Sequence, residues 1–372
     1  MNWWQKLKQN PLARFGALLL LIFYVSVIAA DFVAPYDPYS SQPDGSLLPP
    51  TRIYWRNQQS DQFIGPHVYP TTQGPTDLET GERPSLVDLE KPSPVRFFVK
   101  GPEYKLFRLS LPLPPKFEEV EIFAGIPWNR HLFGTVGEAK LNILGTDEQA
   151  RDQFSRLLYG GRISLSIGLV GISISFPLGM LVGGISGYFG GWIDTLLMRL
   201  VEVLMTIPTI YLLVALAAVL PPGLTSAQRF LLIVLITSLV SWSGLARVIR
   251  GQVLSIKERE FVQASKAMGA QPFYIIVRHV LPQTASYIII SATLAVPSFI
   301  VAESVLSLIG LGIQQPDPSW GNLLSLATNA SILVLQPWLI WPPAVVIILT
   351  VLSFNLLGDG LRDALDPRSF RR

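Results

Sequence analysis

Six long runs of apolar residues constrain the fold of this chain more than any other feature. Each run approaches or exceeds the roughly 17 residues that a tilted helix needs to cross a bilayer. Only 15% of the 372 residues are charged, whereas about a quarter are charged in a typical soluble domain. The sequence therefore predicts an all-α polytopic membrane protein with six transmembrane helices. The runs are Phe15–Ala30, Ile163–Gly187, Val203–Leu220, Phe230–Ala246, Ala285–Ala302 and Trp338–Leu357.

The first run has two interpretations. It follows three basic residues and closes on small residues at Ala29–Ala30, which is also the pattern of a cleavable signal peptide. We favour an uncleaved membrane anchor, because further spans follow and because Leu12 extends the run toward spanning length.

The basic residues predict the orientation, because short cytoplasmic loops carry an excess of Lys and Arg. The N-terminus holds three basic residues, the segment from Arg247 to Arg278 holds six, and the tail after Leu357 holds four. With six spans, all three regions fall on the same side of the membrane. The sequence therefore predicts that both termini are cytoplasmic and that residues 31–144 form an exterior insert.

The exterior insert is expected to be loop-rich and partly β. Val95–Lys100 and Tyr104–Leu109 are short apolar runs on either side of Gly101-Pro102, which predicts a β-hairpin. Disorder is the alternative, but the aromatic residues of the insert favour packing. After the insert, Thr146 and Gln149 have capping-box spacing and predict an exterior amphipathic helix within 145–162, ended by Gly160-Gly161.

A polar, amphipathic segment between spans four and five predicts a helix–turn–helix elbow. Glu258–Met268 places its apolar residues on one broad face. Gly269 suits the left-handed backbone that ends a helix, and Pro272 suits the first turn of a second helix. Two placements remain open for this elbow: it projects into the cytoplasm, or it lies on lipid headgroups. The residues expected on the face are Phe261, Val262, Ala264, Ser265 and Met268.

The elbow resembles the cytoplasmic coupling motif of ABC importer permeases, which reads EAA, three residues, G, nine residues, I, one residue, LP. Gln263-Ala264-Ser265, Gly269 and His279-Val280-Leu281-Pro282 match its spacing. The triplet departs from EAA at its first and third positions, and His279 replaces the isoleucine. The RHxLP close is similar to the dipeptide, oligopeptide and nickel branch of this family.

Three further stretches resemble the C-type subunit of that branch. Gly145-Thr146-Asp147 and the residues up to Leu165 resemble its GTDxxGRDxxSRxxxGxRxSL signature, with Ala150 in place of a glycine. Leu308–Gly312 with Pro316–Gly321 resembles the exterior loop between the last two spans. Gly358–Pro367 resembles the C-terminal signature.

The resemblance implies the type I ABC importer permease fold and a chain of five parts. These parts are the N-terminus with the first span (1–30), the exterior insert (31–144), the exterior helix (145–162), the permease core (163–357, with the coupling elbow at 247–282) and the cytoplasmic tail (358–372). It also implies a multi-pass protein of the bacterial inner membrane.

The resemblance further implies a transport complex whose energy comes from other chains. No G-x-x-x-x-G-K-[ST] phosphate loop occurs in the sequence, so this chain is not expected to be an enzyme or to bind a cofactor. The implied partners are two ABC ATPase subunits that use ATP and Mg²⁺, a second homologous permease, and an exterior substrate-binding protein. The implied cargo is a dipeptide or oligopeptide; nickel chelates, oligosaccharides and peptide-like compounds are alternatives. No metal site is expected, because there is no cysteine and the three histidines are far apart, and the small net charge gives no sign of nucleic-acid binding.

The resemblance also singles out two groups of site residues. The ATPase-coupling elbow comprises Glu260, Gln263, Ala264, Ser265, Ala267, Gly269, His279, Leu281 and Pro282. The candidates for an exterior gate or for receptor docking are Asp147, Arg151, Asp152, Arg156, Glu303 and Trp320. A second interpretation of Glu303 is a plain helix end that faces water.

Other residues near the spans have structural interpretations. Arg199 and Glu202 are three residues apart near Asp194 and predict an ion pair on one helical face. Gly179, Gly183 and Gly187 recur every fourth residue, which predicts a stripe for close helix packing. Pro208 predicts a kink. The rival functions are a secondary transporter or channel, an intramembrane enzyme and a membrane-anchored scaffold. They are less favoured, because the span centres carry no charged pair or catalytic constellation.

Overall fold

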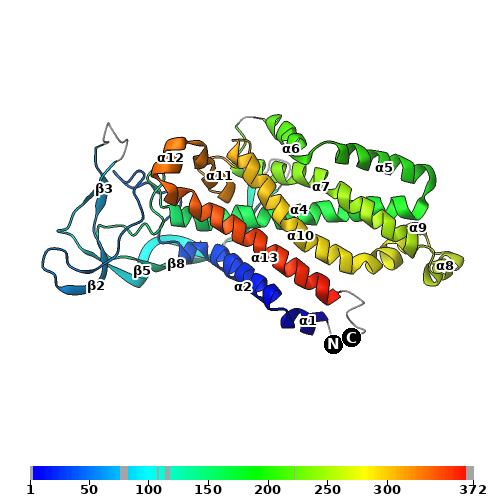
Figure 1. Cartoon of the computed structure of the whole chain (residues 1–372), viewed down its shortest axis with the longest axis horizontal. Helices are drawn as coiled ribbons and strands as arrows, with labels where there is room; N and C mark the ends of the chain where they lie inside the picture. Colours follow the sequence, from blue (N-terminus) through cyan, green and yellow to red (C-terminus); the bar gives the residue numbers. More distant parts are fainter. Residues whose placement is uncertain (1–2, 76–82, 107–108, 114–117, 222, 366–372) are drawn as a thin grey trace.

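The structure, a computed structural model, describes residues 3–75, 83–106, 109–113, 118–221 and 223–365. The end of the C-terminal signature, including Asp366, Pro367 and the three last arginines, lies outside this range, as do Phe107–Arg108 near the end of the predicted hairpin strand Tyr104–Leu109. Within it, thirteen α-helices form an elongated bundle with a β-rich insert at one end (Figure 1). The helices are α1 (Trp3–Gln9), α2 (Pro11–Ile28), α3 (Ala30–Val33), α4 (Gln153–Phe189), α5 (Gly191–Thr206), α6 (Thr209–Ala218), α7 (Ser226–Ile256), α8 (Glu260–Ala267), α9 (Pro272–Ile275), α10 (Ala285–Leu308), α11 (Trp320–Leu324), α12 (Ala330–Leu335) and α13 (Trp341–Leu365).

Five helical segments in the described chain are long and apolar enough to cross a membrane. They are α2, α4, α7, the rod Pro272–Leu308 that contains α9 and α10, and Pro337–Leu365, which contains α13. The bent pair α5–α6 makes a sixth crossing if it spans as one unit. The predicted all-α polytopic membrane fold is confirmed.

The third predicted span, Val203–Leu220, is wrong as a continuous helix. α5 ends at Thr206, α6 begins at Thr209, and the two helices meet at 87°. Pro208 is the cause: it disfavours helical geometry in the residue before it, and Ile207 is extended, with φ −83° and ψ 126°. The predicted kink at Pro208 is therefore a complete break.

Close packing of α4 on α7 forms the centre of the bundle, and the predicted glycine stripe lies at this contact. A Cβ atom at Gly179, Gly183 or Gly187 would collide with the backbone carbonyl of a residue on α7. These carbonyls belong to Trp242, Ala246 and Arg250, which also recur every fourth residue. The stripe therefore lets two helix backbones approach where larger side chains would hold them apart.

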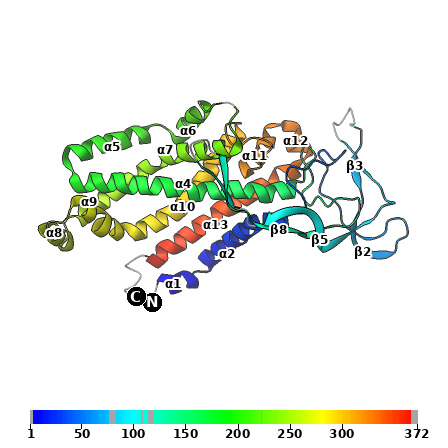
Figure 2. The same cartoon turned by 180° about the vertical axis from the view of Figure 1, so that it is seen from behind.

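The remaining spans surround this pair. α2 packs along α13, and α10 lies against α4 and α13. Leu7 of the short helix α1 and Ala13 of α2 pack on Ala364 at the end of α13. Figures 1 and 2 place α1, the end of α13 and α8 toward one end of the bundle and the insert at the other.

The insert contains a four-stranded antiparallel sheet in the order β1-β2-β5-β8 and two small two-stranded sheets, β3-β4 and β6-β7. Its small core consists of Val68, Ala139 and Leu141 with Val95 and Phe133. The strands are β1 (Tyr54–Arg56), β2 (Phe63–Val68), β3 (Thr71–Gln73), β4 (Ser85–Val87), β5 (Ser93–Leu106), β6 (Leu109–Leu113), β7 (Glu118–Phe123) and β8 (Ile126–Thr135).

The predicted hairpin across Gly101-Pro102 is wrong. β5 runs through both residues as a single strand, and its partner is β8. The pairing register shifts between Lys100 and Tyr104, so the Gly-Pro pair marks an irregularity in the strand and not a turn.

Candidate functional site

The predicted exterior helix at 145–162 is not a separate element. Asp152 caps α4, its carboxylate accepting hydrogen bonds from the amide and the hydroxyl of Ser155, both at 2.7 Å. The helix therefore starts at Gln153, and the capping box expected at Thr146 and Gln149 is wrong. α4 also continues through Gly160-Gly161, where a Cβ atom at Gly161 would collide with Val27 and where Ser319 and Trp320 pack tightly against the glycines.

Asp147 lies just before α4 and binds two arginines inside the protein. Its carboxylate lies 2.6 Å from Arg151 Nη2 and 3.4 Å from Arg156 Nε. All three side chains are buried. A buried charge is costly unless it is paired, so one carboxylate between two guanidinium groups leaves an excess of positive charge that other acceptors must solvate.

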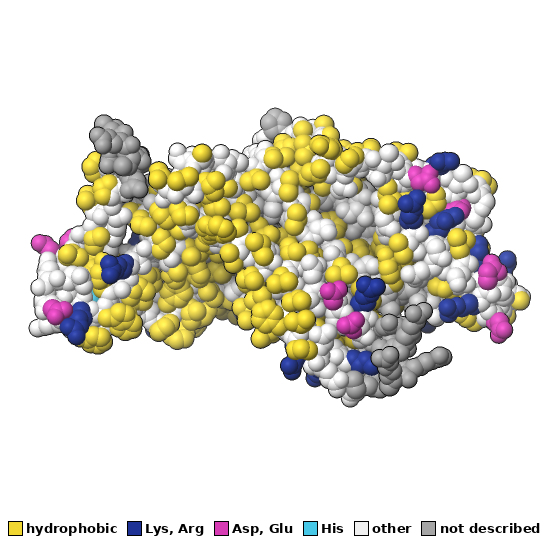
Figure 3. Space-filling model, in the orientation of Figure 1, with side chains coloured by type: hydrophobic (Ala, Val, Ile, Leu, Met, Phe, Trp, Pro, Cys, Tyr) yellow, Lys and Arg dark blue, Asp and Glu magenta, His cyan; other side chains and the backbone are white. Residues whose placement is uncertain are grey.

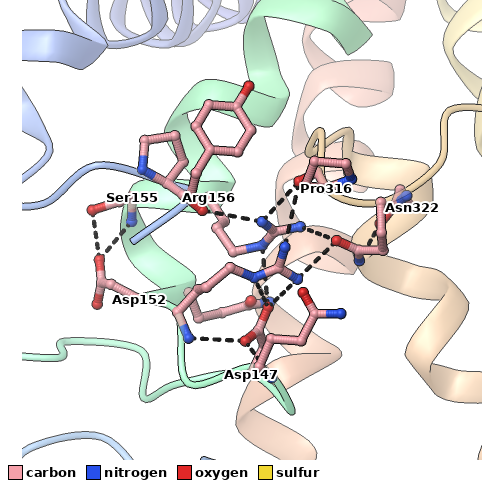
Figure 4. A network of polar contacts seen from close by, with 12 residues as sticks. Asp147, Asp152, Ser155, Arg156, Pro316 and Asn322 are labelled. Carbon is pink, nitrogen blue, oxygen red and sulfur yellow. Dashed lines mark hydrogen bonds and ion pairs between the residues drawn. The ribbon is translucent and has the colours of Figure 1, made fainter. Parts of the chain in front are cut away.

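Those acceptors come from two distant segments of the chain (Figure 4). The side-chain oxygen of Gln315 accepts hydrogen bonds from Arg151 at 2.7 Å and from Arg156 at 2.8 Å. Arg156 also donates to the carbonyls of Pro316 and Pro38, each at 3.1 Å. The network therefore ties the segment after α3, the start of α4 and the loop between α10 and α11 into one unit.

Glu303 lies inside α10, because the helix continues past the predicted end at Ala302 to Leu308. Its carboxylate is fully buried, so the interpretation of a helix end facing water is wrong. It accepts hydrogen bonds from three hydroxyls: Ser307 and Ser319 at 2.7 Å and Ser164 at 3.3 Å. No basic side chain pairs with it in the described structure. The three hydroxyls join α10 to α4 and to the residue that caps α11.

Trp320 completes this contact. Its backbone amide donates to Ser164 Oγ and its indole nitrogen donates to the carbonyl of Leu157, both at 3.0 Å. All six exterior candidates are thus brought to the same end of the bundle, and all six are buried. Burial does not favour direct receptor contact by these side chains, and their role in an exterior gate stays a prediction.

The elbow lies at the opposite end of the bundle, where α8 and α9 meet at Gly269. Gly269 has φ +83°, the left-handed conformation predicted for it. The amide of Gly269 donates to the carbonyl of Lys266 at 3.0 Å, and the amide of Ala270 donates to that of Ser265 at 3.2 Å. These bonds satisfy carbonyls at the end of α8 and fix the turn.

The single broad face expected on α8 is wrong, because its residues divide between two faces. Val262 and Ser265 are buried against the chain's own bundle. Phe261 and Met268 are exposed, and Met268 keeps 82% of its surface accessible. The exposed apolar side chains of the elbow are Phe261, Met268, Phe273, Tyr274 and Val277, and we refer to these five residues as the elbow face.

The other elbow residues take varied positions. Glu260, Gln263, Ala264 and Ala267 are exposed, and Gln263 donates to the carbonyl of Lys257. His279 is half-buried and packs edge-on against Tyr274, with ring centroids 5.5 Å apart.

Leu281 and Pro282 lie where the elbow joins α10. The helix passes from α9 through a π-helical turn at Ile276–Val280 and a 3₁₀ turn at Leu281–Thr284. Such turns accommodate a proline, which offers no amide hydrogen and crowds the preceding turn. The elbow is therefore rigidly continuous with the fifth apolar run.

One ion pair toward the elbow end of the bundle was not predicted from the sequence. Arg199 and Glu202 do pair, at 2.9 Å, but on the surface. Asp194 instead binds Arg250 on α7, with two nitrogen–oxygen distances of 2.5 and 2.6 Å. Asp194 also accepts from the Ser186 hydroxyl on α4. The pairing of Asp194 with a residue 56 positions away had no local signal in the sequence.

Two families match different parts of the chain. Residues 176–371 match the family described as the binding-protein-dependent transport system inner membrane component. Residues 2–50 match the N-terminal transmembrane domain of oligopeptide transport permease C. The first match includes the elbow and the second includes α1, α2 and α3.

Similar proteins are found among bacterial permeases. The chain is 46% identical over 224 residues to the dipeptide transport system permease protein DppC of Bacillus subtilis strain 168, covering 60% of this chain and 68% of that protein. It is 42% identical over 227 residues to the oligopeptide transport system permease protein OppC of Haemophilus influenzae, covering 61% and 70%. Among solved structures, a chain of the inward-facing MetNI methionine ABC transporter aligns with a TM-score of 0.44 and 18% identity, over 57% of this chain and 98% of that chain.

Proposed function

This chain belongs to the family of binding-protein-dependent transport system inner membrane components, and from that membership we propose that it is the permease subunit of an ATP-driven peptide importer. The proposed cargo is a dipeptide or oligopeptide, in line with the named activities of the relatives. In this proposal the chain provides part of the membrane path, and separate subunits hydrolyse ATP. It binds no cofactor itself.

The observation that carries the proposal is the elbow face. Two of its five exposed apolar side chains lie on α8 and its C-cap, and the other three lie on the rod Pro272–Leu308. Exposed apolar groups gathered on one element mark an interaction surface. An ATPase subunit bound to Phe273, Tyr274 and Val277 can act on α10 directly, because α9 continues through Ile276–Val280 and Leu281–Thr284 into α10.

The proposed orientation in the membrane rests on the features at the elbow end of the bundle. α1 and the end of α13 share the side of the elbow (Figure 1), and basic residues concentrate in these regions. We therefore place the elbow and both termini in the cytoplasm and the insert outside. A binding protein would then deliver the peptide on the side of the insert, between this chain and a second, homologous permease, with two ATPase subunits below.

The test is to replace one elbow-face residue and measure the loss of the ATPase. Met268→Glu introduces a charge on the elbow face, and we expect about tenfold less ATPase to co-purify with the tagged chain in mild detergent. Leu86→Glu is the matched control, because Leu86 is an exposed apolar residue of the insert. Equal ATPase recovery with both variants would place the interface elsewhere.

Cargo is tested separately, in liposomes that contain the whole complex. ATP-dependent uptake of labelled peptides that the binding protein retains is expected. Uptake of an oligosaccharide or a nickel chelate, with no peptide uptake, would contradict the assigned cargo while leaving the permease assignment intact.

A further inference from the structure

Two adjacent phenylalanines on β5 are unusually exposed for their size. Phe97 keeps 77% of its surface accessible and Phe98 keeps 56%. Phe98 also has φ +55°, a backbone conformation that is a genuine outlier for a bulky residue. Strain of this kind persists where the surroundings or a function maintain it. Two aromatic rings are therefore exposed to the surroundings of the protein, although the backbone at Phe98 is strained.

These rings lie next to the end of a membrane span. Phe98 contacts Phe32 of α3, with ring centroids 6.1 Å apart. α3 follows α2 after a single residue and packs on β5 and β8. Phe97 and Phe98 therefore lie at the level where the first span leaves the hydrocarbon core.

The rings continue an apolar surface that faces lipid. α2 exposes large apolar side chains at the three- and four-residue spacing of one helical face. Figure 3 shows hydrophobic side chains continuing from the bundle onto the adjoining part of the insert. Because α2 is a span, its exposed face is covered by acyl chains, and the same cover extends to the adjacent rings. The exposed residues of the α2 face are Leu18, Leu21, Ile22, Val25 and Ile28.

Basic residues flank the two rings along β5: Arg96 precedes Phe97, and Lys100 follows Phe98 after Val99. Strands β5 and β8 together carry four basic side chains and one acidic side chain, Glu103. Lys100 and Arg130 are directly opposite each other in the β5–β8 ladder, an arrangement that repels unless an anion lies beside it. Arg130 also donates to the carbonyl of Phe98 at 3.5 Å, which keeps its charge near the rings.

We propose that Arg96, Phe97, Phe98, Lys100 and Arg130 form a membrane-interface anchor in the leaflet on the side of the insert. The rings enter the boundary between headgroups and acyl chains, and the cations bind lipid phosphates. Aromatic rings beside Lys and Arg are the side-chain combination that favours this boundary. The anchor fixes the insert at a set depth beside α2. It depends only on the chain spanning a membrane, and not on what the chain transports.

The test uses the absence of cysteine from this chain. Phe97→Cys gives a single site for the fluorophore NBD on the full-length chain, reconstituted in phosphatidylcholine–phosphatidylglycerol liposomes. Phe63→Cys is the matched control, because Phe63 is 71% exposed on β2 of the same insert. Two quenchers are compared: aqueous iodide, and a phosphatidylcholine that carries a nitroxide near the top of its acyl chain.

The anchor predicts opposite behaviour at the two sites. The label at position 97 is quenched by the nitroxide lipid and is roughly threefold less accessible to iodide than the label at position 63. Equal iodide access at both positions, with no nitroxide quenching, would overturn the proposal. A label at 97 that is shielded from both quenchers would also overturn it, because a protein would then cover the patch.

A second variant tests the phosphate contacts. Lys100→Gln combined with Arg130→Gln, in the chain labelled at position 97, is expected to reduce nitroxide quenching in liposomes that contain phosphatidylglycerol. The label at position 63 reports whether the insert stays folded. Unchanged quenching at position 97 would contradict the proposed binding of lipid phosphates by Lys100 and Arg130.

Discussion

The carboxylate of Glu303 accepts a hydrogen bond from the hydroxyl of Ser319 at 2.7 Å, and this bond ties α10 to the first turn of α11. Ser319 in turn accepts from the amide of Asn322 at 3.0 Å, so one hydroxyl both caps α11 and binds the buried acid. The loop between α10 and α11 is thus held at its end by Glu303 and near its middle by Arg151 and Arg156. In the proposed importer this loop lies on the delivery side. These contacts would hold it in a fixed position beside the substrate path.

Glu303 is predicted to act as a hydrogen-bond acceptor and not through its charge. Glu303→Ala leaves three buried hydroxyls without their hydrogen-bond acceptor and should lower the free energy of unfolding by about 1–3 kcal/mol. Glu303→Gln keeps an acceptor and removes a buried charge that lacks a basic partner, so its stability should equal or exceed that of the parent. Thermal unfolding in nanodiscs distinguishes the two. A loss with Gln as large as that with Ala would show that the charge itself is needed.

The pair Asp194–Arg250 is predicted to contribute more than the surface pair Arg199–Glu202. The first pair is half-buried and joins α5 to α7, whereas the second is exposed within one helix. A double-mutant cycle of Asp194→Asn and Arg250→Gln should give a coupling energy of about 1–2 kcal/mol.

The matched cycle of Arg199→Gln and Glu202→Gln should give less than about 0.5 kcal/mol. Chemical unfolding in detergent measures both. Equal coupling in the two cycles would mean that the pair between α5 and α7 adds nothing beyond a surface contact.

Gly269 is predicted to tolerate size but not a branched Cβ. No described residue lies within 4 Å of the position that a Cβ would take, so a substitution meets strain from φ +83° and no collision with the described part of the chain. Asn adopts such a backbone readily, whereas a β-branched residue does not. Gly269→Asn should cost less than about 1 kcal/mol and retain the ATPase in a pull-down, and Gly269→Val should cost about 1–2 kcal/mol and weaken it. If Asn and Val behaved alike, the turn would not depend on the left-handed conformation.

Features set by local sequence were predictable. Apolar length identified the helical spans, the recurrence of Gly179, Gly183 and Gly187 identified a packing stripe, and Gly269 identified the end of α8. Each depends on residues within one or two turns of a helix, where periodicity and backbone preference are decisive. The kink predicted at Pro208 is a complete break for a local reason too, since Ile207 also leaves the helix.

Features that join distant segments were not predictable. Gln315 accepts hydrogen bonds from two arginines about 160 positions away. Asp194 pairs with Arg250 and not with nearby Arg199. Burial and helix packing determine these pairs. The capping box at Thr146 failed for the same reason: the Thr146 hydroxyl donates to the carbonyl of Gly45 in the insert. The single face predicted for Glu258–Met268 is divided because the bundle covers Val262 and Ser265.

Asp152 is predicted to make the stability of the insert end depend on pH. Burial is the main cause that raises the pKa of its carboxyl from 3.8 to about 6, and the hydrogen bonds from Ser155 and the charge of Lys140 oppose this shift only in part. One of its oxygens, Oδ1, is buried without a hydrogen-bond partner among the residues that the structure describes. Because the pKa is higher in the folded state than in the unfolded chain, folding favours the protonated form. Its stabilising effect is complete below about pH 4 and is lost as the pH rises through about 6.

Thermal unfolding between about pH 4 and pH 8 measures this effect. The pKa shift of Asp152 changes the free energy of unfolding by at most roughly 3 kcal/mol between these two pH values. Asp152→Asn is the control, because an asparagine can still cap α4 through its side-chain oxygen and does not titrate. In this variant the change of stability with pH near pH 6 should disappear. The variant should also be more stable than the parent protein at pH 8. A slope that survives the substitution unchanged would assign the titration to another group, and a less stable variant at pH 8 would show that the carboxylate is stabilised by contacts beyond those of Ser155.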